Sequence, residues 1–162
     1  MKKMILSCVL TLGLGLTVQA QTKISGTSQC DKPDQQNSLE VGDKPGHVFM
    51  IAKQSCTWTK GMEIGGATNK SYESTIFSEV MGAKTHDHGI AVDSWSSGDK
   101  SFVRWQGSAV LKDGKVVGQE GTWTFAGGTG KLTGIKGKGT YKCTAAGDGA
   151  SCEVEGEYDL AK

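Results

Sequence analysis

The clearest chemical pattern in this sequence is His86-Asp87-His88. Alternate residues of a β-strand share one face, so the two imidazoles have the spacing needed to bind one divalent metal ion. In the hairpin that we predict here, Glu79 opposes His86 and adds a carboxylate, a set that suits non-heme iron or manganese. His47, the only other histidine, would instead complete a three-histidine set of the kind that binds zinc.

The competing interpretation, which we favour, places these histidines in solvent. Phe77 opposes His88 in the same register, and the hairpin turns at residues 82–83, where polar side chains are solvated. The sequence shows no second set of hydrogen-bonding partners for the imidazoles. We therefore predict no cofactor, with a divalent metal held by Glu79, His86 and His88 as the alternative.

A second group of residues suits the binding of a small molecule. The Asp-Gly pair at 113–114 is a strong type I′ turn signal between two alternating runs. Counting outward from this turn places Arg104 opposite Trp123, on one face with Gln106 and Gln119. Such a face is more polar than a filled core, and buried polar groups need partners from protein, water or ligand. We therefore predict that these four residues bind a ligand. The alternative is that the tryptophans simply fill the core.

No motif in the sequence identifies a reaction. The nucleophile motif G-x-S-x-G is absent, and the Gly-Thr-Gly-Lys string at 128–131 lacks the earlier glycine and the following Ser or Thr of a phosphate-binding loop. Acidic residues can be paired for glycoside hydrolysis only arbitrarily. The catalytic residues are therefore unknown, and the sequence leaves open whether the protein is an enzyme.

Residues 1–20 have the features of a secretory signal peptide. Lysines at 2–3 precede an apolar stretch over 4–18, and Ala20 provides the small residue that a signal peptidase needs. A lipoprotein signal ending at Cys8 is the alternative, although only four residues precede the tripeptide before that cysteine. We expect residues 21–162 to form one mature domain that is periplasmic or secreted.

Removing the leader leaves a nearly neutral chain. The leader holds two of the 18 basic residues and none of the 17 acidic ones, which leaves a net charge of −1. This balance gives no electrostatic reason to expect nucleic acid or an anionic membrane surface as a partner. No later segment resembles a transmembrane helix. A small-molecule ligand is the partner that we expect, and the sequence does not indicate an oligomeric state.

The cysteines that follow the leader are Cys30, Cys56, Cys143 and Cys152. An even number in an exported chain predicts two disulfides, with three pairings available. A turn centred on 147–148 sets Cys143 opposite Cys152 and aligns three opposite charges on the other face, namely Lys142 with Glu153, Lys138 with Glu157, and Lys136 with Asp159. We predict Cys143–Cys152 and, by elimination, Cys30–Cys56. A bond from Cys30 to either member of the hairpin pair is the alternative.

The rest of the chain has the pattern of an all-β protein. Short segments rich in β-branched and aromatic residues alternate with Gly, Asp, Asn and Ser turns, and helical periodicity is nearly absent. The predicted strands cover 22–29, 47–58, 62–67, 72–81, 84–95, 101–111, 116–126, 133–144 and 151–160. The polar stretch 30–46 is predicted to be a surface loop. The pattern favours an antiparallel sandwich or barrel.

Two segments carry a family resemblance. The sequence DKSFVRW at 99–105, followed by WTFAGGTGKLTG at 123–134, resembles the allene oxide cyclase and dirigent group of small eight-stranded barrels. The resemblance covers about residues 99–141. It implies a single calycin-like antiparallel barrel of about eight strands, whose interior can hold an apolar or phenolic molecule. The plant members of the group guide the cyclisation or coupling of a reactive intermediate.

These observations support three functional hypotheses. The leading one is an exported barrel that binds a small apolar or aromatic molecule. The second is an enzyme that uses the same pocket, either as an isomerase or cyclase or as a metal-dependent oxygenase through His86 and His88. The third is a structural domain with a filled core.

Overall fold

A computed structural model describes residues 21–160 of the chain. Almost all of this range is β-strand, as the alternating apolar pattern predicts. The elements are β1 (Thr22–Cys30), β2 (Gln35–Glu40), β3 (His47–Lys60), β4 (Glu63–Ile64), β5 (Ala67–Met81), β6 (Lys84–Trp95), β7 (Lys100–Lys112), β8 (Lys115–Gly128), the 3₁₀ turn η1 (Gly130–Leu132), β9 (Lys136–Ala146) and β10 (Gly149–Asp159). The predicted signal peptide lies outside the described residues.

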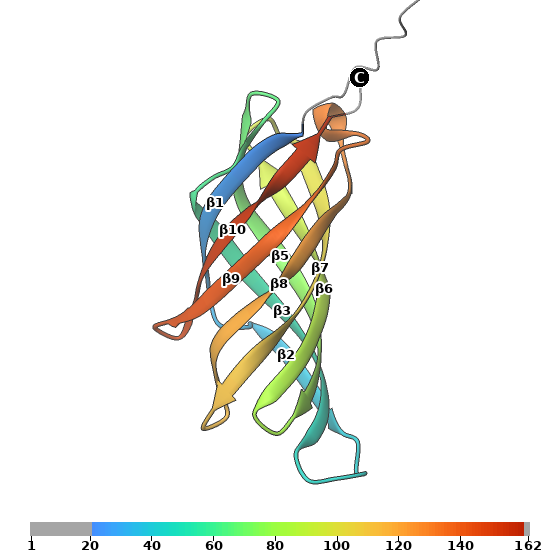
Figure 1. Cartoon of the computed structure of the whole chain (residues 1–162), viewed down its shortest axis with the longest axis vertical. Helices are drawn as coiled ribbons and strands as arrows, with labels where there is room; N and C mark the ends of the chain where they lie inside the picture. Colours follow the sequence, from blue (N-terminus) through green and yellow to red (C-terminus); the bar gives the residue numbers. More distant parts are fainter. Residues whose placement is uncertain (1–20, 161–162) are drawn as a thin grey trace, which may run out of the picture.

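The sheet closes into a barrel because β3 pairs on both of its edges. Its order is β2-β3-β1-β10-β9-β8-β7-β6-β5-β4, and a further pairing of β3 with β5 joins the two sides. Eight strands, β1, β3 and β5 to β10, form the closed wall, and every pairing is antiparallel (Figure 1). The predicted all-β fold with a single barrel of eight strands is confirmed.

Strand β2 lies on the same edge of β3 as β1. Strand β1 ends with Cys30 opposite Cys56, and β2 begins with Gln35 opposite Lys53. The sequence predicted a loop over 30–46, which is wrong for the residues of β2. All six of those residues are exposed, so no alternation of buried and exposed side chains marked the strand. Backbone pairing with β3 defines it instead.

The β9–β10 hairpin has the predicted register. Cys143 opposes Cys152, and these residues form one disulfide, while Cys30–Cys56 forms the other. The three predicted charge pairs are also in register, namely Lys142 with Glu153, Lys138 with Glu157, and Lys136 with Asp159. A shift of one residue would have turned the cysteines outward and the charged residues inward, so this hairpin is strongly specified by its sequence.

The β7–β8 hairpin has the predicted turn but not the predicted register. Asp113 and Gly114 have φ values of 52° and 74°, as a type I′ turn requires. A bulge between residues 110 and 111 then moves the pairing by one residue, so that Trp105 opposes Trp123. One unpaired residue is enough to exchange the inner and outer faces of a strand pair.

The bulge separates the four residues predicted to share a ligand-binding face. Arg104 and Gln106 are exposed on the outside of the barrel, where Arg104 opposes Thr124. Gln119 and Trp123 line the interior. The predicted opposition of Arg104 and Trp123 is therefore wrong, because a count from the turn assumes that every residue is paired, whereas Val117 is not.

The apolar core fills the end of the barrel where β1 begins and β10 ends (Figure 1). Its buried members are Ile24, Met62, Ile64, Ala67, Trp95, Trp123, Leu132 and Ile135. Large side chains fit there because they lie over glycines of the neighbouring strands. A Cβ atom at Gly139 or Gly156 would lie 2.7 or 2.6 Å from the ring of Trp123, too close for any side chain.

Candidate ligand-binding cavity

The barrel interior contains a cavity of about 100 Å³. Its walls are mainly aromatic, and both disulfides line it as well. The aromatic side chains are Trp58, Tyr72, Trp105, Trp123, Phe125 and Tyr141. Apolar cavities of this order of size take up molecules such as benzene in other proteins. The cavity is therefore large enough for one small ring.

A buried carboxyl group, that of Asp93, lies at one part of the cavity wall. Asp93 is 3% exposed, and it accepts hydrogen bonds from Trp58 Nε1 at 3.0 Å and from Ser101 Oγ at 3.3 Å. Ser101 Oγ in turn accepts a hydrogen bond from Trp95 Nε1 at 3.0 Å. Burial raises the pKa of Asp93 to about 6, and the hydrogen bonds from Trp58 and Ser101 only partly offset that rise.

We expect the free energy of unfolding to decrease as the pH rises, because Asp93 loses its proton. Because its pKa is higher in the folded chain than in the unfolded chain, its contribution is complete below pH 3.8 and is lost as the pH rises through about 6. The loss is roughly 3 kcal/mol, since a tenfold change in proton affinity is worth about 1.4 kcal/mol. Urea unfolding between pH 4 and pH 8 measures it.

The matched variants for this test are Asp93→Asn and Asp34→Asn. Asp93→Asn should remove most of the fall in unfolding free energy between pH 4 and pH 7 and leave only the part due to His47, whose pKa is also raised. Asp34 is exposed, so Asp34→Asn should keep that fall. An unchanged pH profile in Asp93→Asn would contradict the assignment to this carboxyl group.

A second buried carboxyl group, that of Asp87, lies behind the wall residue Gln119. Asp87 is 5% exposed, and its Oδ2 atom accepts hydrogen bonds from Thr85 Oγ1 at 2.7 Å and Gln119 Nε2 at 2.8 Å. Its Oδ1 atom is buried and has no partner among the described residues. The hydroxyl oxygen of Tyr141 is likewise buried and without a partner. Burial is the main cause that raises the pKa of Tyr141, and the nearby charge of Asp87 raises it further.

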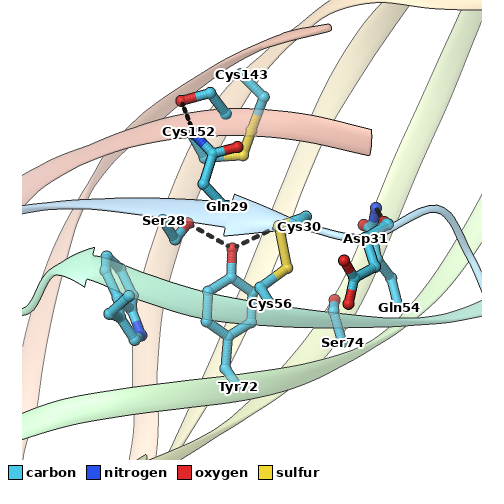
Figure 2. Close-up of a disulfide and its surroundings, with 12 residues drawn as sticks. Ser28, Gln29, Cys30, Asp31, Gln54, Cys56, Tyr72, Ser74, Cys143 and Cys152 are labelled. Atoms are coloured by element: carbon cyan, nitrogen blue, oxygen red, sulfur yellow. Dashed lines mark hydrogen bonds between the residues drawn. A yellow bond between two sulfur atoms is a disulfide. The ribbon is translucent and has the colours of Figure 1, made fainter. Parts of the chain in front are cut away.

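The disulfides form a rigid part of the cavity wall next to Tyr72 (Figure 2). The Tyr72 hydroxyl lies 3.3 Å from Cys30 Sγ and 3.1 Å from Ser28 Oγ. A disulfide sulfur carries no hydrogen, so Tyr72 donates to Cys30 and Ser28 donates to Tyr72. Burial raises the pKa of Tyr72 to about 12, which keeps the phenol neutral. Tyr72 is therefore held in position and keeps its proton at neutral pH.

Comparison with solved structures shows that other proteins share this barrel. One is a protein of unknown function from the DUF3224 family of Shewanella oneidensis MR-1, with a TM-score of 0.53, 14% identity and coverage of 88% of this chain and 99% of that one. Another is the pterocarpan synthase dirigent protein GePTS1, with a TM-score of 0.50, 12% identity and coverage of 97% and 98%. At such identities the likeness concerns the fold alone.

A further structural match is a pyocyanin demethylase, with a TM-score of 0.44, 16% identity and coverage of 82% of this chain and 98% of that one. No protein-family model matches the sequence, and no curated protein matches it. The dirigent match agrees with the barrel implied by the sequence resemblance. Membership of the allene oxide cyclase and dirigent group stays a prediction.

Two features of the described residues bear on location. The disulfides Cys30–Cys56 and Cys143–Cys152 indicate a non-reducing, exported environment. Over residues 21–160, the chain has no helix long and apolar enough to cross a membrane.

The cavity wall includes Asp93 and Tyr141, which were not predicted as site residues, and Trp105, which was assigned to the face opposite Trp123. Asp87, behind Gln119, was not predicted as a site residue either. The inward-facing residues of β6 are Thr85, Asp87, Gly89, Ala91, Asp93 and Trp95, whereas larger apolar residues such as Ile90 point outward. Because apolar side chains normally mark the buried face of a strand, the pattern of β6 pointed to the wrong face.

The histidines lie outside the cavity. His86 and His88 are exposed on the outer face of β6, and His88 stacks on Phe77 with ring centroids 5.4 Å apart. Glu79 opposes His86, as predicted, but its Oε1 atom lies 2.9 Å from Nε2 of His47. Across residues 21–160, no group of three or more His, Cys, Asp or Glu side chains is arranged to hold a metal ion. The expectation of no cofactor, with a metal at Glu79, His86 and His88 as the alternative, stays a prediction.

His47 is held between two carboxylates. Its Nδ1 atom lies 2.6 Å from Asp43 and its Nε2 atom 2.9 Å from Glu79. The hydrogen bond with Asp43 raises the pKa of His47, and the bond with Glu79 adds to that effect. The imidazole therefore links Asp43, in the loop that precedes β3, to Glu79 on β5.

Proposed function

We propose that the protein is an exported binding protein, periplasmic or secreted, that holds a small aromatic molecule inside its barrel. The observation that supports this most directly is the aromatic-walled cavity of about 100 Å³. Aromatic side chains stack on flat rings, and a few polar groups in an apolar wall fix the orientation of a ligand. Gln119 and Trp123, two of the residues predicted from the sequence, contribute to this wall.

A titration with toluene tests the proposal. Ligand binding to the folded state alone raises stability, by about 2.7 kcal/mol at a ligand concentration 100 times Kd. We therefore expect toluene to raise the melting temperature and to change the tryptophan fluorescence, because Trp58, Trp105 and Trp123 line the cavity. Indole provides a second aromatic probe of larger size.

Two variants control the titration. Ala91 lines the cavity and is 7% exposed, so Ala91→Leu should fill part of the space and weaken toluene binding by about tenfold or more. Its neighbour Ile90 is 48% exposed on the outside, and Ile90→Leu should leave binding unchanged. If neither toluene nor indole raises the melting temperature, the protein is better described as a structural domain.

A second candidate function is acid–base catalysis in the same cavity, of an isomerase or cyclase kind. It is favoured by Asp93, whose pKa of about 6 lies near neutral pH, where a general acid or base is most effective. The Asp93→Asn variant separates the two functions. A binding protein would keep its ligand affinity in this variant, whereas an enzyme would bind its substrate and lose turnover.

A further inference from the structure

We propose that Asp87 and Tyr141 form a polar subsite beside the cavity, and that it selects an aromatic ligand carrying an amino or ammonium group. This inference rests on the proposed function and names the chemical class of its ligand. Two buried atoms carry it, Asp87 Oδ1 and Tyr141 Oη, because neither has a hydrogen-bond partner among the described residues. Buried polar atoms without partners are rare in folded proteins and are costly to leave unpaired.

The two atoms are brought together by glycines on the strands between them. Gly107 pairs with Asp87 on one side and with Gly121 on the other, and Gly121 pairs with Tyr141. Tyr141 thus lies across two residues without side chains, and its ring extends from β9 over β8 towards β6. A Cβ atom at Gly107 would collide with the Tyr141 hydroxyl, which places that hydroxyl on the row that ends at Asp87.

The charge of the subsite is not balanced by protein groups. As a carboxylate, Asp87 only accepts hydrogen bonds, and both of its donors, Thr85 and Gln119, are neutral. No salt bridge to Asp87 or Asp93 occurs within residues 21–160. The side chains that line the cavity include no Lys, Arg or His. A buried negative charge of this kind is stabilised by a cation or by additional donors.

An aromatic amine meets these requirements. Its N–H groups can donate to Asp87 Oδ1 and to Tyr141 Oη, its positive charge offsets that of the carboxylate, and its ring occupies the aromatic cavity. The same aromatic walls attract a cation through their ring faces. Gln119 lines the cavity and donates to Asp87 Oδ2, so its side chain connects the cavity wall with the carboxylate.

Benzylamine and ethylbenzene provide a matched pair of probes, since they differ only by an ammonium in place of a methyl group at pH 7.5. We expect the wild-type protein to bind benzylamine about tenfold or more tightly than ethylbenzene, as measured by calorimetric titration, because hydrogen bonds to charged groups are the strongest available here. Asp87→Asn should remove this preference and leave ethylbenzene affinity within about twofold of the wild type.

Controls separate this inference from the proposed function. Tyr141→Phe removes only the hydroxyl and should reduce the ratio of benzylamine affinity to ethylbenzene affinity, so it tests the subsite if Asp87→Asn does not fold. Asp34→Asn, at an exposed position, should keep the full preference. Ethylbenzene binding with no preference for benzylamine would overturn the subsite and assign its free atoms to water, while the cavity would stand. If neither probe binds, the proposed function itself fails.

Discussion

Replacing Trp123 with alanine is expected to lower the free energy of unfolding by about 3–5 kcal/mol. Trp123 is 5% exposed and belongs to the buried core, and its ring centroid lies 5.1 Å from that of Phe125. Its Nε1 atom donates to the backbone oxygens of Thr140 and Glu155, each at 3.2 Å. The change removes all of these contacts, and the surrounding backbone cannot move in because Gly139 and neighbouring residues are held in the sheet.

Urea unfolding followed by circular dichroism measures this loss. The control is Arg104→Ala, because the sequence alone placed Arg104 opposite Trp123, whereas the structure exposes it on the outer face. We expect Arg104→Ala to change stability by no more than about 0.5 kcal/mol and to leave toluene binding intact. Equal losses from the two variants would mean that they share a face, and would contradict the bulge that leaves Val117 of β8 unpaired.

The contrast between two hairpins shows what the sequence can predict. In β9–β10, the turn, the opposed cysteines and the opposite charges all require one register, so counting from the turn was sufficient. In β7–β8, both faces carry mixed side chains, and the bulge near Val110 could not be detected from them. A hairpin without a clean apolar face specifies its register weakly in the sequence.

Barrel closure depends on contacts that local patterns do not encode. The pairing of β3 with β5 and of β1 with β10 joins segments through their backbones, and β10 lies far from β1 in the sequence. The family resemblance supplied the expectation of a barrel, whereas the alternating pattern allowed a sandwich as well. The cavity was still harder to predict, because the acidic residues of β6 point inward from a strand whose histidines and Ile90 point outward.

Glycines explain why the barrel has a cavity at all. A Cβ atom at Gly89 would lie 2.6 Å from the ring of Trp105, and one at Gly156 would lie as close to Trp123. Each ring therefore lies flat against a bare stretch of backbone and extends along the wall. The space at the barrel centre remains partly empty because the large side chains cover glycines on neighbouring strands.

Removing the Cys30–Cys56 disulfide through a double replacement by alanine is expected to cost about 3.5 kcal/mol, against about 2.7 kcal/mol for Cys143–Cys152. The two bonds join residues separated by 26 and 9 positions, and a longer loop constrains the unfolded chain more. Thermal and urea unfolding of the two double variants measure the difference. Wild-type protein treated with a reducing agent should lose more stability than either variant.

The Cys30–Cys56 bond also has a local role that the other bond lacks. It joins β1 to β3 at the point where β1 ends. Beyond this point β2 pairs with the same edge of β3. The Cys143–Cys152 bond only reinforces a hairpin that ten other residue pairs already hold in register. A greater loss of stability from the Cys143–Cys152 variant would contradict both the effect of loop length and the local role of the Cys30–Cys56 bond. If the expected order holds, loss of the Cys30–Cys56 bond costs more stability than loss of the hairpin bond, and dependence on both bonds is consistent with a protein that folds in a non-reducing environment.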